Sequence, residues 1–340
     1  MAPSGDNCQP WRFVVRGNEI LVSNIPERDQ SLYSWGQRAS YFAHGALLEN
    51  MVIAARALGY AADLQLFPDA EQKNLTARIH LAPIAPSADL LYDAIARRAT
   101  NRKPYRNAPL AADDRSALTA LQGSVPGAKL LLVEDPENRR LIAHAASANE
   151  EILFSNERMH RFFFSHINWT NEEDAKKSIG FHIDTLELPP PVKPLFRAFK
   201  HWRVARTLSG VGLHRQIARG NAKNIYTTGS AHGGILVAHH TPTDFVQAGR
   251  LMERLWLTAT ARGLSVQPLA GITFLMQGIL AGEHSSLTVS QVGRITSAYA
   301  VMKSALGASS DSTLVMAFRI GEAPPPSAHA SRLEPEVRFA

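Results

Sequence analysis

The sequence predicts an α+β fold built from two related halves. Segments typical of strands and of helices alternate along its 340 residues, and two segments far apart in the chain resemble each other. A composition that is 45% hydrophobic and 19% charged supplies enough apolar side chains for a sizeable core. We expect the halves to form a pseudo-dimer around a central antiparallel or mixed sheet with flanking helices, and a cleft to lie where the halves meet.

Local patterns predict the individual elements. Two strands over 12–15 and 19–22 flank Gly17-Asn18, a pair that accepts the positive φ of a hairpin turn. Helices that stop at glycine are predicted before Gly59 and Gly263. The other predicted elements are helices over 40–58, 90–98, most of 138–164, 245–261 and 289–306, and strands over 76–81, 129–133 and 313–320.

An internal repeat supports the division into halves. Residues 45–59 (GALLENMVIAARALG) align without gaps on residues 249–263 (GRLMERLWLTATARG), and six positions are identical. Each copy leads to a later strand of similar character. The identical pairs are Gly45 and Gly249, Leu47 and Leu251, Glu49 and Glu253, Ala55 and Ala259, Ala57 and Ala261, and Gly59 and Gly263.

Composition excludes several classes of protein. The single cysteine, Cys8, rules out an internal disulfide and a cysteine-rich metal site. No run approaches the roughly 18 apolar residues of a membrane span, and the N-terminus lacks the pattern of a secretory signal. We therefore expect a cytoplasmic protein. The histidines show no metal-ligand spacing, and no nucleophile elbow, P-loop or dinucleotide fingerprint is present.

Positive charge is concentrated in one stretch. No acidic residue occurs between Glu187 and Asp244, whereas eight lysines and arginines do. Around 195–206, apolar and basic residues alternate in the pattern of an amphipathic helix. This helix could attract an anionic substrate or the phosphates of a nicotinamide cofactor, lie on an anionic membrane or touch nucleic acid, or it could simply be a solvated helix over the core.

The N-terminal loop is rich in hydrogen-bonding side chains. Ser4, Asn7 and Gln9 can serve the edge of a planar heterocycle, while Pro3 and Pro10 restrict the loop. Without further evidence, this loop could equally cap a sheet. Its pattern P-S-x-x-N-x-Q-P-W, followed by an aromatic-ended strand, resembles the flavin-binding loop of the nitroreductase family.

That resemblance implies an FMN site. In the family the loop reaches across a dimer interface, so Pro3, Ser4, Asn7 and Gln9 would serve an FMN held mainly by the second half. Arg98, Thr100 and Arg102 resemble the element that holds the FMN phosphate, with threonine replacing serine. An alternative is a basic helix end that interacts with its own carbonyls.

Three further segments resemble the family. Pro268, Ala270 and Gly271 match the segment that presents a backbone N–H to flavin N5, although Ala270 replaces the usual acidic residue. Arg332 matches a basic residue on the phosphate. Asn156 could match an asparagine at the pyrimidine edge of the flavin.

The order of these matches indicates a duplicated chain. We expect residues 1–96 to be a degenerate first half that supplies the loop, and residues 97–340 to be a second half with the main FMN site and a possible lid over 189–223. One FMN would then bind per monomeric pseudo-dimer, although further self-association is possible.

The resemblance predicts an FMN-dependent oxidoreductase. NAD(P)H would deliver hydride to flavin N5, and an electron-poor acceptor such as a nitro compound or quinone would receive it; no catalytic side chain is required. The alternative is a low-turnover FMN-binding module, because the chain begins at the loop and could be a domain of a larger protein. Replacing Arg98 and Arg332 together should abolish FMN retention with the fold intact.

Overall fold

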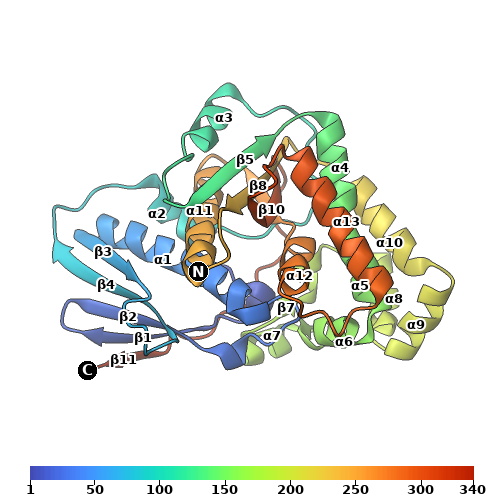
Figure 1. Cartoon of the computed structure of the whole chain (residues 1–340), viewed down its shortest axis with the longest axis horizontal. Helices are drawn as coiled ribbons and strands as arrows, with labels where there is room; N and C mark the ends of the chain where they lie inside the picture. Colours follow the sequence, from blue (N-terminus) through green and yellow to red (C-terminus); the bar gives the residue numbers. More distant parts are fainter.

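The computed structural model describes all 340 residues, Met1–Ala340, and confirms the α+β class (Figure 1). Its longer strands form two separate sheets of four and five strands, beside one short strand pair, where we expected one central sheet. Helix α1 (Arg38–Ala57) packs on the strands of the first sheet, and α11 (Pro242–Ala261) packs on those of the second. The two helices also pack on each other, so a helix pair occupies the centre.

The first sheet has the order β11-β1-β2-β4-β3. The predicted hairpin is confirmed, and Gly17 in its turn has a φ of 55°. The strands are β1 (Trp11–Arg16), β2 (Glu19–Asn24), β3 (Tyr60–Leu66), β4 (Leu75–Pro83) and β11 (Val337–Phe339).

The second sheet has the order β5-β8-β10-β9, and all its pairs are antiparallel. Every residue of β8 and β10 is buried, which makes these two strands the interior of the fold. The strands are β5 (Ala128–Val133), β8 (Ala231–Val237), β9 (Ser265–Pro268) and β10 (Thr313–Gly321).

The two sheets share one connectivity. In each sheet, two antiparallel strands come before a long central helix and two more strands come after it. The second of these later strands lies next to the earlier pair, which gives the orders β1-β2-β4-β3 and β5-β8-β10-β9. Helices α1 and α11 each have 20 residues, and their bounds differ by the same offset as the sequence repeat. Both end before a glycine of positive φ, 89° at Gly59 and 76° at Gly263.

The paired helices cross at equivalent glycines. A Cβ on Gly45 would lie 2.8 Å from Cα of Gly249, and one on Gly249 would lie 3.1 Å from Cα of Gly45. The same Cβ atoms would lie about 2 Å from the carbonyl oxygens of Val246 and Phe42. Only glycine at both positions allows such close packing, and the reciprocal contacts are those expected at a two-fold axis.

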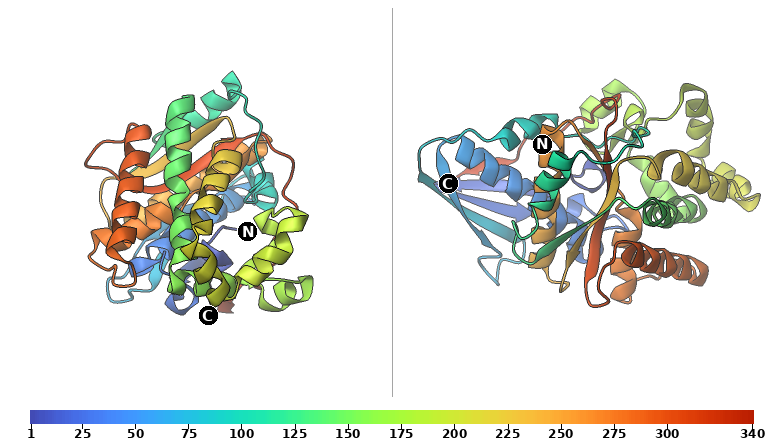
Figure 2. Two further views of the ribbon diagram at one scale, coloured as in Figure 1. Left: turned by 90° about the vertical axis from the view of Figure 1, so that its right-hand side faces the viewer. Right: turned by 90° about the horizontal axis from the view of Figure 1, so that it is seen from above.

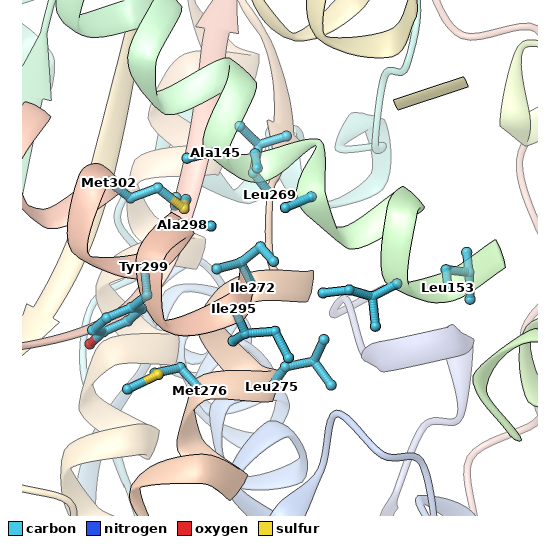
Figure 3. Packing of buried hydrophobic residues seen from close by; sticks show 14 of the residues in the cluster. Ala145, Leu153, Leu269, Ile272, Leu275, Met276, Ile295, Ala298, Tyr299 and Met302 are labelled. Carbon is cyan, nitrogen blue, oxygen red and sulfur yellow. The ribbon is translucent and has the colours of Figure 1, made fainter. Parts of the chain in front are cut away.

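Helices α4, α12 and α13 lie on the side of the second sheet away from α1 (Figure 2), whereas α2 and α3 pack on α11. Side chains of α12 and α13 interleave there in the largest apolar cluster of the core (Figure 3). The longer helices are α2 (Leu90–Arg97), α3 (Ala112–Thr119), α4 (Pro136–Ala146), α5 (Ala148–Ser155), α6 (Glu157–Ser165), α12 (Gly271–Leu280) and α13 (Val289–Ala305).

The basic stretch does not form one helix. A break at 200–201 separates α8 (Lys193–Phe199) from α9 (Trp202–Gly210), because the apolar side chains of both turn inward: Phe199 packs on Phe154 with ring centroids 5.3 Å apart. Helix α10 (Leu213–Asn221) and a π-helical turn η6 (Ala222–Tyr226) follow. Seven of the eight cations are exposed: Arg197, Lys200, Arg203, Arg206, Arg215, Arg219 and Lys223.

The C-terminal tail joins the two halves. Strand β11 pairs in parallel with β1, so the end of the second predicted half completes the sheet of the first. A short parallel pair, β6 (Ile167–Asn168) and β7 (Phe181–His182), flanks α7 (Asn171–Lys177) near the loop. No helix is long and apolar enough to cross a membrane.

Candidate functional site

The N-terminal loop is held in a strained, well-defined shape. A 3-10 turn over Gly5–Asn7 places Asp6, Asn7 and Gln9 at φ values of 47°, 53° and 49°, in the left-handed region that L-residues rarely adopt. The Ser4 hydroxyl accepts a hydrogen bond from the Gln9 N–H at 3.0 Å, which closes the loop.

The polar side chains of the loop bind other parts of the chain. Gln9 donates to the Ser178 carbonyl at 2.8 Å and accepts from the Leu333 N–H at 3.0 Å, and Asn7 donates to the Ser331 carbonyl at 2.8 Å. The predicted meeting of loop and tail is therefore present. However, the Gln9 side chain itself connects the loop to the tail. Of the side-chain amide atoms of Asn7 and Gln9, only Oδ1 of Asn7 is buried without a hydrogen-bond partner.

Arg98 and Arg332 also converge on this loop. Arg98 donates to the Met1 carbonyl and Arg332 to the Ala2 carbonyl, both at 2.8 Å. Burial first, and then the charge of Arg98, lower the pKa of Arg332 to about 10. The charges of the same two arginines, after burial, lower the pKa of the Met1 amino group. Two guanidinium groups thus lie close to one carboxylate, Glu253, and leave an excess of positive charge.

Arg98 is more deeply involved in the fold than the sequence suggests. Its side chain is 2% exposed, its Nε lies 3.2 Å from Oε1 of the fully buried Glu253, and its guanidinium stacks 4.5 Å from the ring of Trp256. This ion pair argues against the expectation that Arg98 can be replaced with the fold intact, because its loss would leave a buried carboxylate without its nearest counter-ion.

The rest of the predicted phosphate element runs along β9. Thr100 forms a parallel bridge with Val266, and the Asn101 N–H donates to the Val266 carbonyl at 3.3 Å. Arg102 turns away from Arg98: it donates to the Thr185 carbonyl at 3.0 Å. The two arginines of the predicted phosphate element therefore have different surroundings: Arg98 lies at the N-terminal loop, and Arg102 faces the segment around Thr185.

Strand β9 leads into the predicted N5 segment. Pro268 pairs with β10, and Ala270 and Gly271 form the start of α12, whose first N–H groups have no intrahelical acceptor. A Cβ on Gly271 would lie 2.1 Å from Oδ1 of Asn149, so only glycine fits there. That Oδ1 accepts a hydrogen bond from the Tyr33 hydroxyl at 2.9 Å.

Asn156 lies apart from this arrangement. Its Oδ1 caps α6 by accepting from the Met159 N–H at 3.1 Å, and its Nδ2 donates to the Ser286 carbonyl at 2.7 Å. The structure therefore gives Asn156 a helix-capping role, which a sequence of S-N-E-R ahead of a helix would also predict.

We expect Asn156→Ala to lower the free energy of unfolding by about 1 kcal/mol, because an N-cap is lost. FMN uptake should be unchanged. Urea denaturation and a flavin absorbance titration of the same variant check both statements, and weakened FMN uptake at full stability would restore Asn156 to the site.

The structure adds a group of side chains that the sequence did not indicate. We call Asp6, Tyr33, Arg102, Glu150 and Tyr226 the inner polar cluster. Burial is the largest cause of the pKa shift of each of these five groups. By exposed surface, Glu150 is buried and the other four residues are half-buried. Such side chains lie deep in the protein and keep some access to solvent. Their positions are too far apart in sequence for any motif to reveal them.

Two carboxyl groups of this cluster have unusual protonation. Burial raises the pKa of Asp6 to about 6 and that of Glu150 to about 7. Asp6 also raises the pKa of the Tyr33 hydroxyl, as does Glu150. Carboxyl groups poised near neutral pH are more common in functional sites than elsewhere.

Other candidate features lie elsewhere. A cleft of about 500 Å³ is lined by residues that include Arg106, Arg262 and Glu322, and a second of about 220 Å³ by residues that include Trp35 and Arg158. None of the predicted site residues lines either cleft. No group of three or more histidine, cysteine, aspartate or glutamate side chains is placed to share a metal ion.

Comparison with known proteins identifies relatives. No protein-family model matches the chain. An uncharacterised protein of Mycobacterium tuberculosis is 26% identical over 340 residues, which is 97% of this chain and 46% of the relative. A probable NAD(P)H nitroreductase, PigM, of Serratia sp. is 24% identical over 79% of this chain and 77% of the relative.

Shorter and weaker matches agree with these. A M. tuberculosis protein provisionally named an NAD(P)H nitroreductase is 31% identical over 35% of each chain. The FMN and NADPH-dependent nitroreductase NfnB of Sphigopyxis sp. is 15% identical over 72% of this chain and 95% of that one, with a TM-score of 0.38, too low to add to the sequence evidence. The matched regions span less than half the length of the first relatives.

These relationships place the chain among α+β proteins with nitroreductase-family homologues. The chain is homologous to proteins named NAD(P)H nitroreductases, over most of its length in the case of PigM.

Proposed function

We propose that this chain binds one FMN and uses it as an NAD(P)H-dependent oxidoreductase. The observation that carries the proposal is the convergence of the N-terminal loop, Arg98 and the C-terminal tail, of which the loop and the tail are more than 300 residues apart in the chain. The homology to proteins named NAD(P)H nitroreductases supports the same function.

The charges present fit a phosphate. Arg98 and Arg332 outnumber the single carboxylate Glu253 beside them, so their positive charge would favour a bound phosphate. Arg332 would bind it most directly, because its other interactions are with a carbonyl, whereas Arg98 is committed to Glu253.

The segment along β9 fits the rest of the cofactor. Thr100 lies beside Val266, and β9 continues through Pro268 to Ala270 and Gly271, whose backbone N–H groups would face the flavin ring. Ser4 and Asn7 would contact the ring from the loop. Bound FMN would accept hydride from NAD(P)H and pass it to a nitro compound or quinone, while the protein positions both.

The exposed cations of α8 to α10 support the choice of NAD(P)H. Seven exposed lysines and arginines of α8 to α10 and the following turn η6 have no acidic partner in an ion pair, so the surface would attract the cofactor's phosphates. We also propose that residues 189–223 form a lid over the FMN site. We further propose a cytoplasmic location for the protein.

We further propose that the chain arose by duplication, with halves at 1–96 and 97–340. The shared strand order and the glycine crossing support it. One chain would then supply a complete FMN site as a monomeric pseudo-dimer.

A spectrum tests the function. Purified protein mixed with FMN should turn yellow, retain the colour on desalting and bleach on adding NADPH or NADH under anaerobic conditions. Protein that dithionite bleaches but neither nicotinamide cofactor does would favour the low-turnover FMN-binding module. Protein that fails to retain FMN would contradict both functions.

We expect Arg332→Gln to weaken FMN binding by about tenfold to a hundredfold, since a charge-assisted hydrogen bond contributes about 1.5–3 kcal/mol. Arg338→Gln is the matched control, because Arg338 lies on the same tail with a side chain that is 70% exposed. Fluorescence quenching of FMN measures both dissociation constants. Equal values for the two variants would remove Arg332 from the phosphate site.

A further inference from the structure

Glu150 occupies an unusual position in the inner polar cluster. It lies on α5 and is 8% exposed; its Oε1 accepts a hydrogen bond from the Tyr226 hydroxyl, while its Oε2 is buried without a partner. An unpartnered carboxylate oxygen in the interior is costly when charged, because no donor replaces the lost water. The geometry therefore favours a carboxyl that carries its proton on Oε2.

Glu150 is adjacent on α5 to the residue that contacts the segment predicted to face the flavin. Asn149, the preceding residue, occupies the space where a Cβ of Gly271 would be, and Tyr33 bonds to Asn149. Tyr226, on the other side of Glu150, interacts electrostatically with Arg102. Asn149 and Tyr226 thus connect Glu150 to two segments: the start of α12 at Gly271, which the proposed function assigns to FMN, and the segment of Arg102.

We propose that Glu150 is the proton donor for reduction of the acceptor, with Tyr226 holding its carboxyl in place. The inference rests on the proposed function and adds a residue to it. At Ala270 the chain has no carboxyl of its own, and the residue that abuts the neighbouring Gly271 is Asn149, which precedes Glu150 on α5.

The surroundings of Glu150 allow its carboxyl to gain and to lose a proton near neutral pH. Burial raises its pKa to about 7, and the hydrogen bond from Tyr226 opposes that rise. Both protonation states are then populated near neutral pH, which suits a general acid. Glu151, on the same helix, raises the pKa slightly.

Groups on the neighbouring elements are mostly engaged elsewhere. Helix α12 carries no charged residue. Arg294 of α13 and His214 of α10 interact with Glu151. Arg161 of α6 pairs with Glu157, and Arg139 of α4 donates to the Thr227 and Gly229 carbonyls. Arg203 and Arg206 of α9 are exposed.

The reaction balances with this donor. Reduction of a quinone to a quinol consumes two electrons and two protons, and the hydride that originates from NAD(P)H carries both electrons and one proton. Glu150 supplies the second proton from its carboxyl, becomes a carboxylate, and regains a proton from solvent before the next cycle. The net change is NAD(P)H, quinone and one proton converted to NAD(P)⁺ and quinol.

Stability measurements test the protonation without any cofactor. A carboxyl whose folded pKa is raised above its unfolded value destabilises the fold increasingly as pH rises from about 4.5 to about 7. The melting temperature of Glu150→Gln, relative to the wild type, should therefore rise over this interval and then level off. Glu151→Gln, which removes a surface partner of Arg294, should show no such rise.

Kinetics with two acceptors test the role. Glu150→Gln should slow quinone reduction by about a hundredfold, the usual contribution of a general acid, and should abolish the fall in wild-type rate above pH 7. Reduction of ferricyanide, which takes electrons and no proton, should stay within twofold, as should bleaching of bound FMN by NADPH. Tyr226→Phe should show the same acceptor selectivity with a smaller loss.

The outcomes separate the inference from the function it rests on. Equal losses with quinone and ferricyanide, or an unchanged quinone rate and pH profile in Glu150→Gln, would overturn Glu150 as donor while FMN binding and bleaching still support the oxidoreductase. Failure of the wild type to bind FMN would overturn both.

Discussion

Replacing Arg98 with alanine is expected to lower the free energy of unfolding by about 3–5 kcal/mol, the usual cost of removing one partner of a buried ion pair. Arg98 is the counter-ion of Glu253, whose carboxyl is fully buried and has no hydrogen-bonded oxygen. Chemical denaturation measures the loss. Arg97→Ala is the matched control, because Arg97 is exposed on α2 and should change stability by no more than about 0.5 kcal/mol.

The pH dependence of the Arg98 effect identifies its cause. Burial raises the pKa of Glu253, and Arg98 opposes the rise. Without Arg98 the carboxylate is more costly, so the destabilisation should grow as pH rises and shrink as acid neutralises Glu253. A second variant, Arg98→Met with Glu253→Leu, should recover most of the stability, because paired apolar replacements avoid the unpaired charge. A pH-independent loss that the double variant fails to restore would contradict the ion-pair explanation.

Replacing Gly249 with alanine is expected to cost on the order of 3 kcal/mol, at the upper end of overpacking effects. The new Cβ would lie 1.9 Å from the carbonyl oxygen of Phe42, which is backbone and cannot rotate away, so α1 and α11 must separate. Because the equivalent clash occurs at Gly45, Gly45→Ala should cost a similar amount. Thermal unfolding of both variants provides the comparison.

Gly293 supplies the control for the helix crossing. It lies within α13, and a Cβ there would meet nothing within 4 Å. Gly293→Ala should therefore stabilise the protein by about 0.5–1 kcal/mol through the lower entropy of the unfolded chain. If Gly249→Ala were as harmless as Gly293→Ala, the helices could not cross as the structure describes.

Much of the fold could be predicted because its signals are local. The hairpin depends on Gly17-Asn18, and the two long helices on repeated apolar positions that end at Gly59 and Gly263. Strand β8 was missed because Gly233 and Gly234 have low strand propensity. Those glycines are required by packing, since a Cβ on Gly233 would lie 2.2 Å from the ring of Phe318.

Helix α12 was missed for a different reason. Seven of its ten residues are buried, so its sequence lacks the alternation of apolar and polar positions that marks a surface helix. The break between α8 and α9 was also unpredictable, because the apolar positions 195–202 fit one amphipathic helix as well as two. Packing of Phe199 and Trp202 around His160 decides the break.

The sequence alone determined the segments that the proposed site uses: the N-terminal loop, the arginines around position 100, the tail at Arg332 and the repeat that relates the halves. Only the tertiary structure decided the contacts of the side chains, because it makes Gln9 a link between loop and tail, Arg98 a counter-ion and Asn156 a helix cap, and it buries Glu150 with one oxygen unpartnered. The physical reason is that turns and helix ends depend on neighbouring residues, whereas ion pairing and protonation depend on desolvation and on partners that are distant in the chain.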